Sequence, residues 1–369
     1  MNVLITGAKG FIGKNLISVL SVSKEHTIFQ YDIDSDTALL SEYTKECDFV
    51  IHLAGVNRPK DEAEYTYGNL WFTETLLEKL ATGSNKSPVL MSSSIQAAID
   101  NPYGRSKKAA EETLLRYSET NKTLVYIYRL PNVFGKWCRP NYNSVVATFC
   151  HNIANGLEIA INDPDSELKL VYIDDVVRNF INILNAKTQL TSNYCEVLPT
   201  YTTSVGELAE LIRSYKENRY LLHIADMSDE FTKKLYATYT SYLPTDIFSY
   251  PLKMNTDDRG SFTEFLRTPD RGQISVNISK PGITKGNHWH QTKTEKFLVV
   301  KGSGVIRFRR IGTAEVVEYN VNGEKPEVVD IPVGYTHNIE NTGNYDMVTV
   351  MWANEPFDPD IPDTIYEKV

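Results

Sequence analysis

One segment in the C-terminal third of the chain limits what this sequence can fold into more than any other. Within residues 282–302, His288 and His290 are separated by a single residue, and Glu295 follows after four more. On an extended strand, residues two apart point to the same side, and four residues leave room for a turn before the next strand. His337 comes later, after a glycine-containing turn. Three imidazoles and one carboxylate form a ligand set for a divalent transition metal.

The residues around this segment predict a β-barrel. Short alternating strands at 273–278, 305–310 and 347–352 are separated by glycine turns, as in an antiparallel jelly roll. Five residues separate Gly282 from His288 and six separate Glu295 from Gly302, a spacing that resembles the cupin family. The second motif departs from the family pattern where Pro326 replaces its leading glycine. The resemblance implies one metal, for which zinc is expected, held by His288, His290, Glu295 and His337. A metal-free cupin whose histidines only form hydrogen bonds is the alternative.

The N-terminus carries a pattern typical of dinucleotide binding. An apolar strand at 2–6 leads into a loop containing Gly7, Gly10 and Gly13, and an amphipathic helix follows at 14–22. The glycines allow a tight turn, a close approach of backbone N–H groups to a pyrophosphate, and packing of the helix on the strand. Further strands at 27–32, 48–55 and 88–94 alternate with helices. This alternation predicts a doubly wound parallel sheet of the Rossmann type, with its chemistry at the carboxyl ends of the strands.

Tyr103 and Lys107 lie four residues apart at the start of a predicted helix, so they share one face of it. A lysine ammonium beside a phenol favours the phenolate and is expected to lower the pKa of Tyr103. A serine hydroxyl from the end of the preceding strand can share the substrate oxygen. These groups would form a proton relay for interconversion of a carbonyl and an alcohol. The spacing leaves both Ser93 and Ser94 open as the partner, and Ser94 is taken as the candidate.

Residues 1 to about 243 resemble the extended short-chain dehydrogenase/reductase family, in its nucleotide-sugar-modifying branch. The resemblance is carried by segments 6–13, 52–55, 92–94, 103–107 and 129–135. It implies cofactor contacts by residues of the glycine loop, the strand ends and the catalytic helix, namely Gly7, Lys9, Gly10, Phe11, Ile12, Gly13, Asp32, Leu53, Ala54, Asn69, Tyr103, Lys107 and Pro131. It also places Asn132 toward the substrate, with Arg139 in a loop suited to sugar and diphosphate contacts. Lys9 and the resemblance favour NADPH, whereas the charge of Asp32 favours NADH.

Composition and charge narrow the class of protein further. The net charge of −9 argues against nucleic acid and anionic membranes as partners, and no stretch approaches a membrane span. The four cysteines form no close pair, so a reducing cytoplasm is the simplest compartment. Two prolines and the absence of periodicity place a linker at 244–251. We therefore expect an NAD(P)-binding domain at 1–243 and a cupin domain at 252–369, in a chain that forms homodimers.

The combination of these two domains resembles the CapF family of bifunctional capsular polysaccharide enzymes. The resemblance implies a cupin that epimerises carbon 3 of a UDP-2-acetamido-2,6-dideoxy-4-hexulose. The reductase would then reduce carbon 4 with NADPH to UDP-N-acetyl-6-deoxy-L-talosamine, on the way to UDP-N-acetyl-L-fucosamine. Lys285, His288 and Tyr335 are the candidate proton carriers of the epimerisation. Two alternatives stay open: a reductase with a non-catalytic cupin that binds a sugar or forms a dimer, and a redox-neutral epimerase with tightly bound NAD.

Overall fold

The chain packs as two compact units. The computed structural model describes residues 1–186, 192–268, 270–358, 360 and 362–369. One unit comprises residues 1–213 and 229–244, and the other comprises 214–228 and 245–369. The expected division at 244 differs from this in one respect, because 214–228 packs with the C-terminal unit. The reason is backbone pairing with β11 (Gly260–Thr268): the Arg267 N–H donates to the Leu222 carbonyl at 2.8 Å, and the Ile224 N–H donates to the Arg267 carbonyl.

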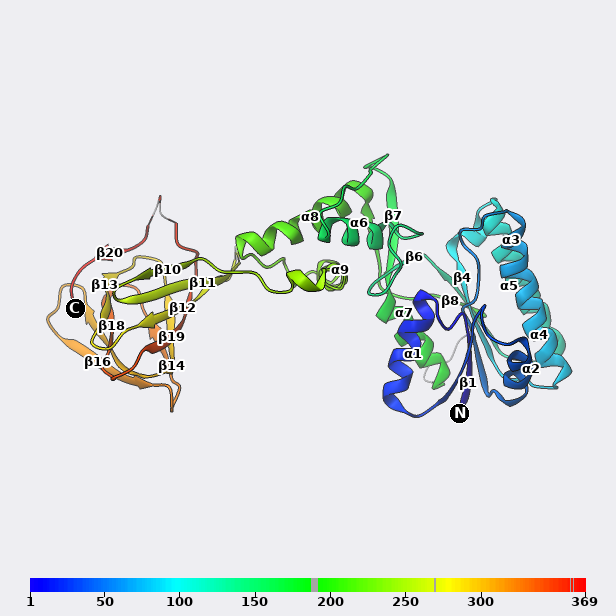
Figure 1. Cartoon of the computed structure of the whole chain (residues 1–369), viewed down its shortest axis with the longest axis horizontal. Helices are drawn as coiled ribbons and strands as arrows, with labels where there is room; N and C mark the ends of the chain where they lie inside the picture. Colours follow the sequence, from blue (N-terminus) through cyan, green and yellow to red (C-terminus); the bar gives the residue numbers. More distant parts are fainter. Residues whose placement is uncertain (187–191, 269, 359, 361) are drawn as a thin grey trace. The chain divides into compact units, whose positions relative to one another are not determined.

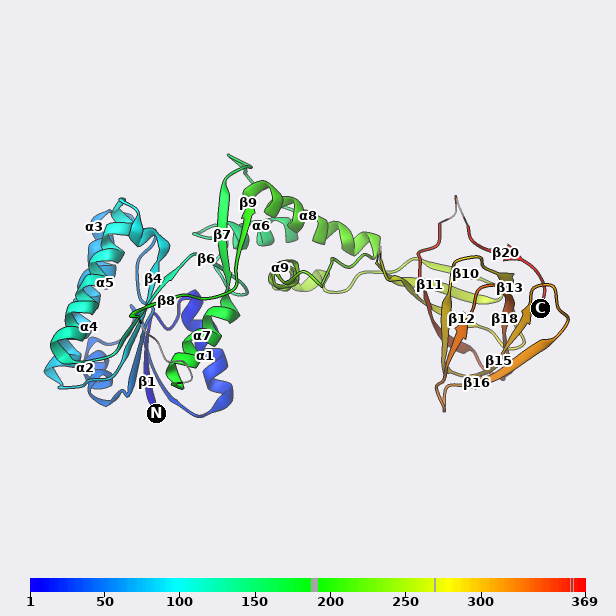
Figure 2. The ribbon, with the colours of Figure 1, turned by 180° about the vertical axis from the view of Figure 1, so that it is seen from behind.

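The core of the N-terminal unit is a parallel sheet covered by helices on both faces. In the described residues its strand order is β2-β1-β3-β4-β5-β8. The strands are β1 (Asn2–Thr6), β2 (Thr27–Tyr31), β3 (Phe49–His52), β4 (Val89–Ser94), β5 (Val125–Leu130) and β8 (Tyr194–Cys195). Helices α1 (Phe11–Ser23) and α7 (Ile173–Leu184) cover one face, and α2 (Thr37–Glu46), α4 (Phe72–Thr82) and α5 (Pro102–Asn121) cover the other (Figures 1 and 2).

Alternation along β1 explains the two cores of this unit. Val3 and Ile5 point to the face where α1 and α7 pack, whereas Leu4 points to the face of α2, α4 and α5. All three side chains are fully buried, as expected for a strand covered on both faces. The carboxyl ends of the parallel strands therefore lie at one edge of the sheet, where the following loops can form a site.

Smaller elements complete the N-terminal unit. A three-stranded sheet contains β6 (Asn132–Phe134), β7 (Glu167–Tyr172) and β9 (Thr200–Ser204). The remaining helices are α3 (Ala63–Tyr65), a π-helix (Thr66–Trp71), a 3₁₀ turn (Ile95–Ala98), α6 (Val145–Ala154), α8 (Val205–Leu221), whose end belongs to the C-terminal unit, and α9 (Glu230–Thr240). Among the described residues, no helix combines the length and apolar content needed to cross a bilayer.

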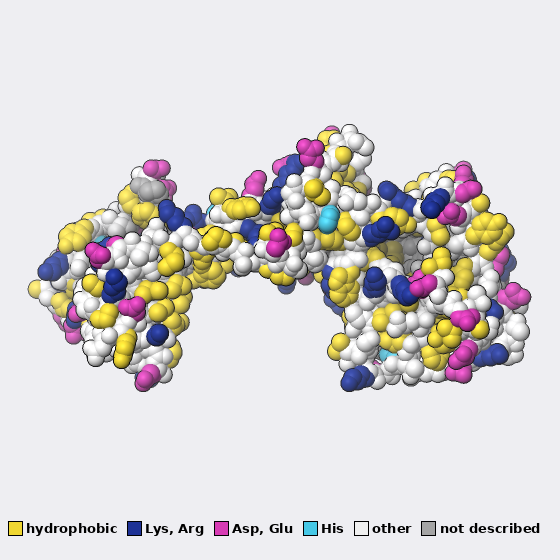
Figure 3. Space-filling view, in the orientation of Figure 1, with side chains coloured by type: hydrophobic (Ala, Val, Ile, Leu, Met, Phe, Trp, Pro, Cys, Tyr) yellow, Lys and Arg dark blue, Asp and Glu magenta, His cyan; other side chains and the backbone are white. Residues whose placement is uncertain are grey.

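The C-terminal unit consists mainly of two antiparallel sheets. One has the order β10-β11-β12-β19-β14-β17 and the other β16-β15-β18-β13-β20. Besides β11, the strands are β10 (Met254–Asp257), β12 (Gly272–Ser279), β13 (Thr284–Trp289), β14 (Glu295–Lys301), β15 (Ser303–Arg310), β16 (Val316–Asn322), β17 (Val328–Ile331), β18 (Tyr335–Asn341), β19 (Met347–Ala353) and β20 (Ile365–Tyr366). Phe297, Ile306 and Ile339 fill the core between the sheets, and Tyr335 packs against them. On the face shown in Figure 3, basic and acidic side chains are interspersed over both units.

Candidate functional site

The glycine loop after β1 has the close packing that its spacing predicts. Gly7 has a φ of +69°, and a Cβ atom there would lie 2.7 Å from the backbone nitrogen of Ala54. A Cβ atom at Gly13 would lie 2.4 Å from the Gly7 carbonyl oxygen. Gly10 is the N-cap of α1 and has no side chain to cap the helix, so the N–H groups of Phe11 and Ile12 stay available for an anion. Leu53 borders the loop by donating its N–H to the Thr6 carbonyl.

At the end of β2, the Asp32 side chain contacts the backbone of Lys9 in the glycine loop. The Asp32 carboxylate accepts hydrogen bonds from the N–H groups of Lys9, at 2.7 Å, and Ile33, at 2.8 Å. The exposed Lys9 side chain forms an ion pair with Asp34, and its hydrogen bond lowers the pKa of Asp34. Sequence reasoning missed Asp34 because nothing in its spacing marks it as a partner of the glycine loop.

Ser94, Tyr103 and Lys107 come together where β4 and α5 meet. Asn101 caps the start of α5 by accepting the Gly104 N–H at 2.7 Å, which places Tyr103 in the first turn of the helix. The Ser94 hydroxyl lies near the Tyr103 phenol and opposes the rise of its pKa, while its oxygen accepts the Gln96 N–H at 3.2 Å. The neighbouring Ser93 hydroxyl instead donates to the fully buried Glu111. Of the two serines that the sequence left open, the geometry therefore brings Ser94 to the tyrosine.

The expected direction of the Tyr103 pKa was wrong for this structure. Burial raises the pKa of Tyr103, and the nearby Ser94 hydroxyl offsets only part of this effect. The Lys107 ammonium does not act on the phenol, because it donates to the Ser92 carbonyl at 3.1 Å. Burial also lowers the pKa of Lys107 to about 8, although the nearby Glu111 opposes this. Tyr103 is therefore held as a neutral phenol.

Asn69 is buried below these residues, and its amide already has partners in the protein. Its Oδ1 atom accepts the Val56 N–H at 2.9 Å, and its Nδ2 atom donates to the Val56 carbonyl and to Ser106. A Cβ atom at Gly55 would lie 2.7 Å from this Oδ1 atom and 3.2 Å from the Lys107 ammonium. Asn69 therefore shapes the loop after β3 from within the π-helix.

The other predicted cofactor and substrate residues lie after β5. Pro131 connects β5 to β6. Asn132 is exposed and donates to the Lys169 carbonyl at 3.3 Å. The Arg139 guanidinium, also exposed, stacks over the Tyr142 ring at 5.0 Å. These contacts do not indicate a role in catalysis or binding. The assignments of Pro131 to the cofactor and of Asn132 and Arg139 to the substrate therefore stay predictions.

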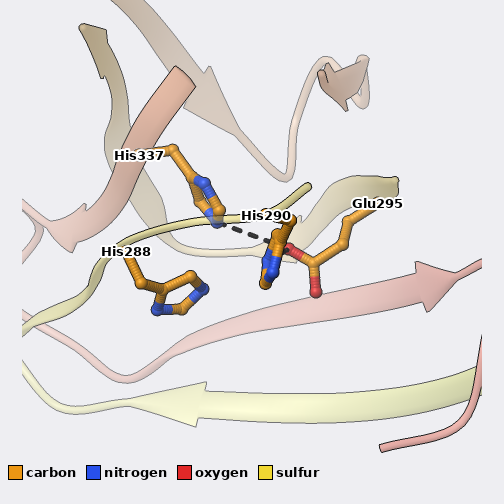
Figure 4. A group of neighbouring side chains, drawn as sticks. All are labelled: His288, His290, Glu295 and His337. Atoms are coloured by element: carbon orange, nitrogen blue, oxygen red, sulfur yellow. Dashed lines mark ion pairs between the residues drawn. The ribbon is translucent and has the colours of Figure 1, made fainter. Parts of the chain in front are cut away.

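The four predicted metal ligands converge in the C-terminal unit. His288 comes from β13, His290 from the turn that follows, Glu295 from the start of β14 and His337 from β18 (Figure 4). One ligand atom of each lies within 4.8 Å of those of the others. The Glu295 Oε2 atom is 3.4 Å from the Nε2 atom of His290 and 3.3 Å from that of His337.

In the part of the chain that the structure describes, several polar atoms of this cluster are buried without a partner, as in a site that binds a cation. The His290 Nε2, His337 Nε2 and Glu295 Oε2 atoms are all buried without a hydrogen-bond partner among the described residues. Such atoms carry a desolvation cost that a bound metal ion would remove. Burial works against the charge of Glu295, yet the two histidines hold the pKa of Glu295 far below its usual range. Burial lowers the pKa of His288 to about 4, so its imidazole is neutral, as a ligand must be.

The C-terminal tail orients one of these ligands, which sequence reasoning missed. The Asp363 carbonyl pairs with the Nδ1 atom of His290, leaving Nε2 to face the cluster. The Asp363 carboxylate accepts the backbone N–H groups of Gln291, Thr292 and Lys293 at 2.8 to 3.1 Å. These hydrogen bonds hold the pKa of Asp363 well below its usual range, against the effect of burial. A single aspartate 73 residues away therefore fixes both the ring and the turn that follows it.

Two cavities of the C-terminal unit meet at the cluster, and both are lined by His288 and Glu295. The Lys293 cavity has a volume of about 710 Å³ and extends from Lys293 to Arg267 and the end of α8 at Tyr220. The Lys285 cavity has a volume of about 620 Å³ and also contains His337, Asn277 and Arg259. Of the three candidate proton carriers, Lys285 and His288 line these cavities, whereas Tyr335 does not. Tyr335 packs into the apolar core instead.

Comparison with known proteins identifies the family. Residues 3–194, more than half of the chain, match the model of the NAD dependent epimerase/dehydratase family. The chain belongs to the NAD dependent epimerase/dehydratase family. Residues 255–365 of this epimerase/dehydratase family member also match the polysaccharide biosynthesis C-terminal domain. The first match covers the glycine loop and the Ser94–Tyr103–Lys107 group, and the second covers the histidine cluster.

Two relatives of this epimerase/dehydratase family member match it over almost the whole chain, and a more distant one matches two thirds of it. A UDP-2-acetamido-2,6-beta-L-arabino-hexul-4-ose reductase of Pseudomonas aeruginosa is 47% identical over 364 residues, which are 99% of this chain and 98% of the relative. The crystal structure of the capsular polysaccharide assembling protein CapF from Staphylococcus aureus matches with a TM-score of 0.94 and 51% identity over 100% of both chains. A UDP-glucuronic acid 4-epimerase of Bacillus cereus, 18% identical, matches 66% of this chain with a TM-score of 0.57 and shares the fold alone.

These matches decide three of the sequence-based predictions. The resemblance to the CapF family is confirmed over the whole chain. The predicted fold class, a doubly wound parallel sheet followed by an antiparallel β unit, is confirmed. The chain is an enzyme of nucleotide-sugar metabolism that uses a nicotinamide cofactor.

Proposed function

We propose that this enzyme is bifunctional and acts on a UDP-2-acetamido-2,6-dideoxy-4-hexulose. The C-terminal unit, a cupin, epimerises carbon 3, and the N-terminal unit then reduces the 4-keto group with NADPH. The product is UDP-N-acetyl-6-deoxy-L-talosamine, on the pathway to UDP-N-acetyl-L-fucosamine for capsular polysaccharide. The observation that supports the proposal is that one chain carries two groups of side chains suited to these two steps, Ser94–Tyr103–Lys107 in one unit and the histidine cluster in the other. The P. aeruginosa reductase also supports the proposal, because its match covers 99% of this chain and 98% of its own length.

In the N-terminal unit, NADPH supplies the hydride and the protein supplies the proton. Tyr103 donates its phenolic proton to the oxygen that develops charge on carbon 4, and Ser94 holds that oxygen through a second hydrogen bond. The raised pKa of Tyr103 suits this direction of transfer, because a neutral phenol has a proton to give. We propose that the Lys107 ammonium leaves the Ser92 carbonyl as charge develops on the phenol, and that it then stabilises the phenolate left behind.

The two steps have a necessary order. The hydrogen on carbon 3 is acidic only while carbon 4 is a ketone, and reduction removes that acidity. Epimerisation in the C-terminal unit must therefore precede reduction. A zinc ion held by His288, His290, Glu295 and His337 would supply Lewis acidity at this centre, or serve a structural role. Lys285 is the candidate proton carrier in the Lys285 cavity, and His288 is the second candidate.

We propose NADPH over NADH because of the position of Lys9. Its ammonium lies at the rim of the glycine loop and is paired only with the exposed Asp34 among the described residues. A 2′-phosphate could replace Asp34 as its partner. Asp32, the residue that favoured NADH, has its carboxylate engaged by the backbone of Lys9 and Ile33. A preference for NADH in the ratio kcat/KM would show that Asp32 still selects the ribose hydroxyls.

One experiment separates the proposed function from its alternatives. The purified protein is incubated with the UDP-keto-hexulose in D₂O, with and without NADPH. Deuterium is expected at carbon 3 in both reactions, and stoichiometric oxidation of NADPH in the second. Oxidation without deuterium at carbon 3 would mean a reductase with a non-catalytic C-terminal unit. Purification with bound NAD, and no consumption of NADPH, would mean a redox-neutral epimerase.

The proposal also covers assembly and location. We propose a homodimer formed through the C-terminal unit, where strand β16 at a sheet edge exposes Val316, Val317 and Tyr319. Light scattering at increasing protein concentration tests this. We propose the cytoplasm as the compartment, which agrees with the free thiols of Cys47, Cys138, Cys150 and Cys195.

The reductase is expected to lose activity above about pH 8. The pKa of Lys107 is lowered to about 8, so the ammonium that stabilises the phenolate is present below this pH and is lost as the pH rises through it. We expect kcat/KM for reduction to fall about tenfold per pH unit above it. The measurement is the pH profile of NADPH oxidation. Lys107→Arg should extend the active range, whereas Lys108→Met on the exposed side of α5 should not change it. A wild-type profile that is flat to about pH 9.5 contradicts this role.

The variant Asp363→Ala is expected to bind the metal about 10- to 100-fold more weakly. It removes the carboxylate that holds three backbone N–H groups of the turn after His290. The backbone carbonyl of residue 363, which pairs with the His290 ring, then loses its fixed position, although every ligand is still present. Competition with a chelator measures the affinity, and Asp358→Ala in the same tail is the matched control. Equal affinity in both variants would show that the turn holds His290 without Asp363.

A further inference from the structure

The charges of the two cavities at the histidine cluster are unequal. The Lys293 cavity contains three cationic side chains, Lys253, Arg267 and Lys293. Arg267 is neutralised by Glu264 through two contacts of 2.6 Å. Among the described residues, no carboxylate pairs with the side chain of Lys253 or Lys293. The cavity therefore holds two positive charges in excess, apart from the cluster itself.

Lys293 is the more unusual of these two lysines. It is only 7% exposed, and its ammonium lies 5.9 Å from the centre of the Phe357 ring. It lines the same cavity as His288, His290 and Glu295, so its charge lies close to the cluster. Burying an ammonium group without a counter-charge costs folding free energy. Binding of an anionic ligand beside it would offset this cost.

The backbone around Lys293 is fixed from both sides. Its own N–H donates to Asp363 at 2.9 Å, and the N–H of Thr294 donates to Asn354 at 3.0 Å. The ammonium is therefore carried by a turn whose position is set by two distant segments of the chain. A fixed backbone is expected around a side chain that binds a ligand, whereas an ordinary surface lysine does not need it.

The Lys285 cavity is less suited to an anion. The Lys285 ammonium already donates to Asn277 and to the Ile278 carbonyl, both at 2.8 Å. Arg259 is paired with Asp257 at 2.6 Å, and this carboxylate also lines the cavity. A diphosphate placed there would meet two acids, Asp257 and Glu295. Among the described residues, Lys285 is the one lysine or arginine of this cavity without a carboxylate partner, and its ammonium already has two hydrogen-bond partners. These polar groups suit sugar hydroxyl and amide groups better.

We propose that the Lys293 cavity receives the diphosphate of the nucleotide sugar, with Lys293 as its main counter-charge and Lys253 at the rim. The hexulose ring then lies at His288 and Glu295 and reaches into the Lys285 cavity. This inference rests on the proposed function, because it assumes that a nucleoside diphosphate sugar enters the C-terminal unit. It assigns Lys293 to substrate binding, a role that no sequence motif indicates.

The test uses the full chain and the exchange of deuterium at carbon 3 without NADPH, a reaction that reports on the C-terminal unit alone. For Lys293→Met we expect the KM of exchange and the inhibition constant of UDP to rise at least ~10-fold, the loss of one charge-assisted hydrogen bond. The value of kcat should stay within about threefold, because the lost contact is equal in ground and transition states. Lys296→Met, at an exposed lysine paired with Asp330, is the matched control. Lys293→Arg should restore most of the affinity.

Two results would overturn the inference. One is an unchanged KM and UDP inhibition constant in folded Lys293→Met, and the other is a loss confined to kcat, which would place the ammonium at the reacting ring. If the wild type exchanges no deuterium, the proposed function fails and calorimetric titration with UDP tests the cavity directly. Weakening of one of two binding events in Lys293→Met would support the diphosphate site, and identical isotherms would reject it. Lys253 is exposed at the rim, so Lys253→Met should leave the fold intact. Its effect on the KM of exchange and on the UDP inhibition constant is a second test.

Discussion

Tyr103→Phe is expected to lower the rate of NADPH oxidation ~100-fold or more, the usual contribution of a general acid. The substitution removes one oxygen atom from a side chain that lies near Ser94 and whose ring centre is 5.6 Å from that of Tyr65. The ring packing survives, so the fold and the affinity for the cofactor should persist. The loss should appear in kcat and equally in kcat/KM, because the proton is transferred only in the transition state.

The control for this experiment lies on the same helix. Tyr117→Phe also removes a phenolic oxygen from α5, where it forms a hydrogen bond with the Asn85 carbonyl at 3.3 Å. We expect near-wild-type oxidation of NADPH from this variant. Exchange of deuterium at carbon 3 should be unchanged in Tyr103→Phe, since it belongs to the other unit. Rapid oxidation of NADPH by folded Tyr103→Phe would remove the tyrosine from its proposed role.

Loss of the proposed metal is the second large effect that we expect, in the double variant His290→Ala/His337→Ala. These two residues supply Nε2 atoms that are buried and lie 3.4 and 3.3 Å from the Glu295 carboxylate. Without them, two of four ligands are missing and the affinity should fall below detection. The melting temperature should fall as well, because metal binding adds to the free energy of folding. Elemental analysis of protein purified without chelator measures the metal content.

His223→Ala is the matched control for the metal experiment, since it changes a histidine of the same unit outside the cluster. It should retain one metal ion per chain. A full complement of metal in the double variant, or much less than one ion per chain in the wild type, would refute the site. Exchange at carbon 3 by metal-free, folded protein would leave the site intact and make the metal structural.

The sequence by itself determined the features that depend on local spacing. The glycine loop was predictable because the turn requires a positive φ at Gly7 and Gly13 packs on the Gly7 carbonyl within the same strand–turn–helix unit. Tyr103 and Lys107 were predictable as neighbours because both lie on one helix. His288 and His290 were predictable as neighbours because a single residue separates them at the end of β13. Each of these relations spans only a few residues, so backbone geometry alone implies it.

The tertiary structure decided the features that depend on contacts between distant segments. Ser94, and not Ser93, meets Tyr103 because Glu111 of the following helix engages Ser93. Asp363 orients His290 across 73 residues, and no spacing rule relates the two. The pKa of Tyr103 rises, where the helical spacing predicted a fall, because burial and the engagement of Lys107 by a carbonyl are properties of packing. The burial of Lys293 is of the same kind, because desolvation depends on every segment around a charge, and a sequence records only its neighbours along the chain.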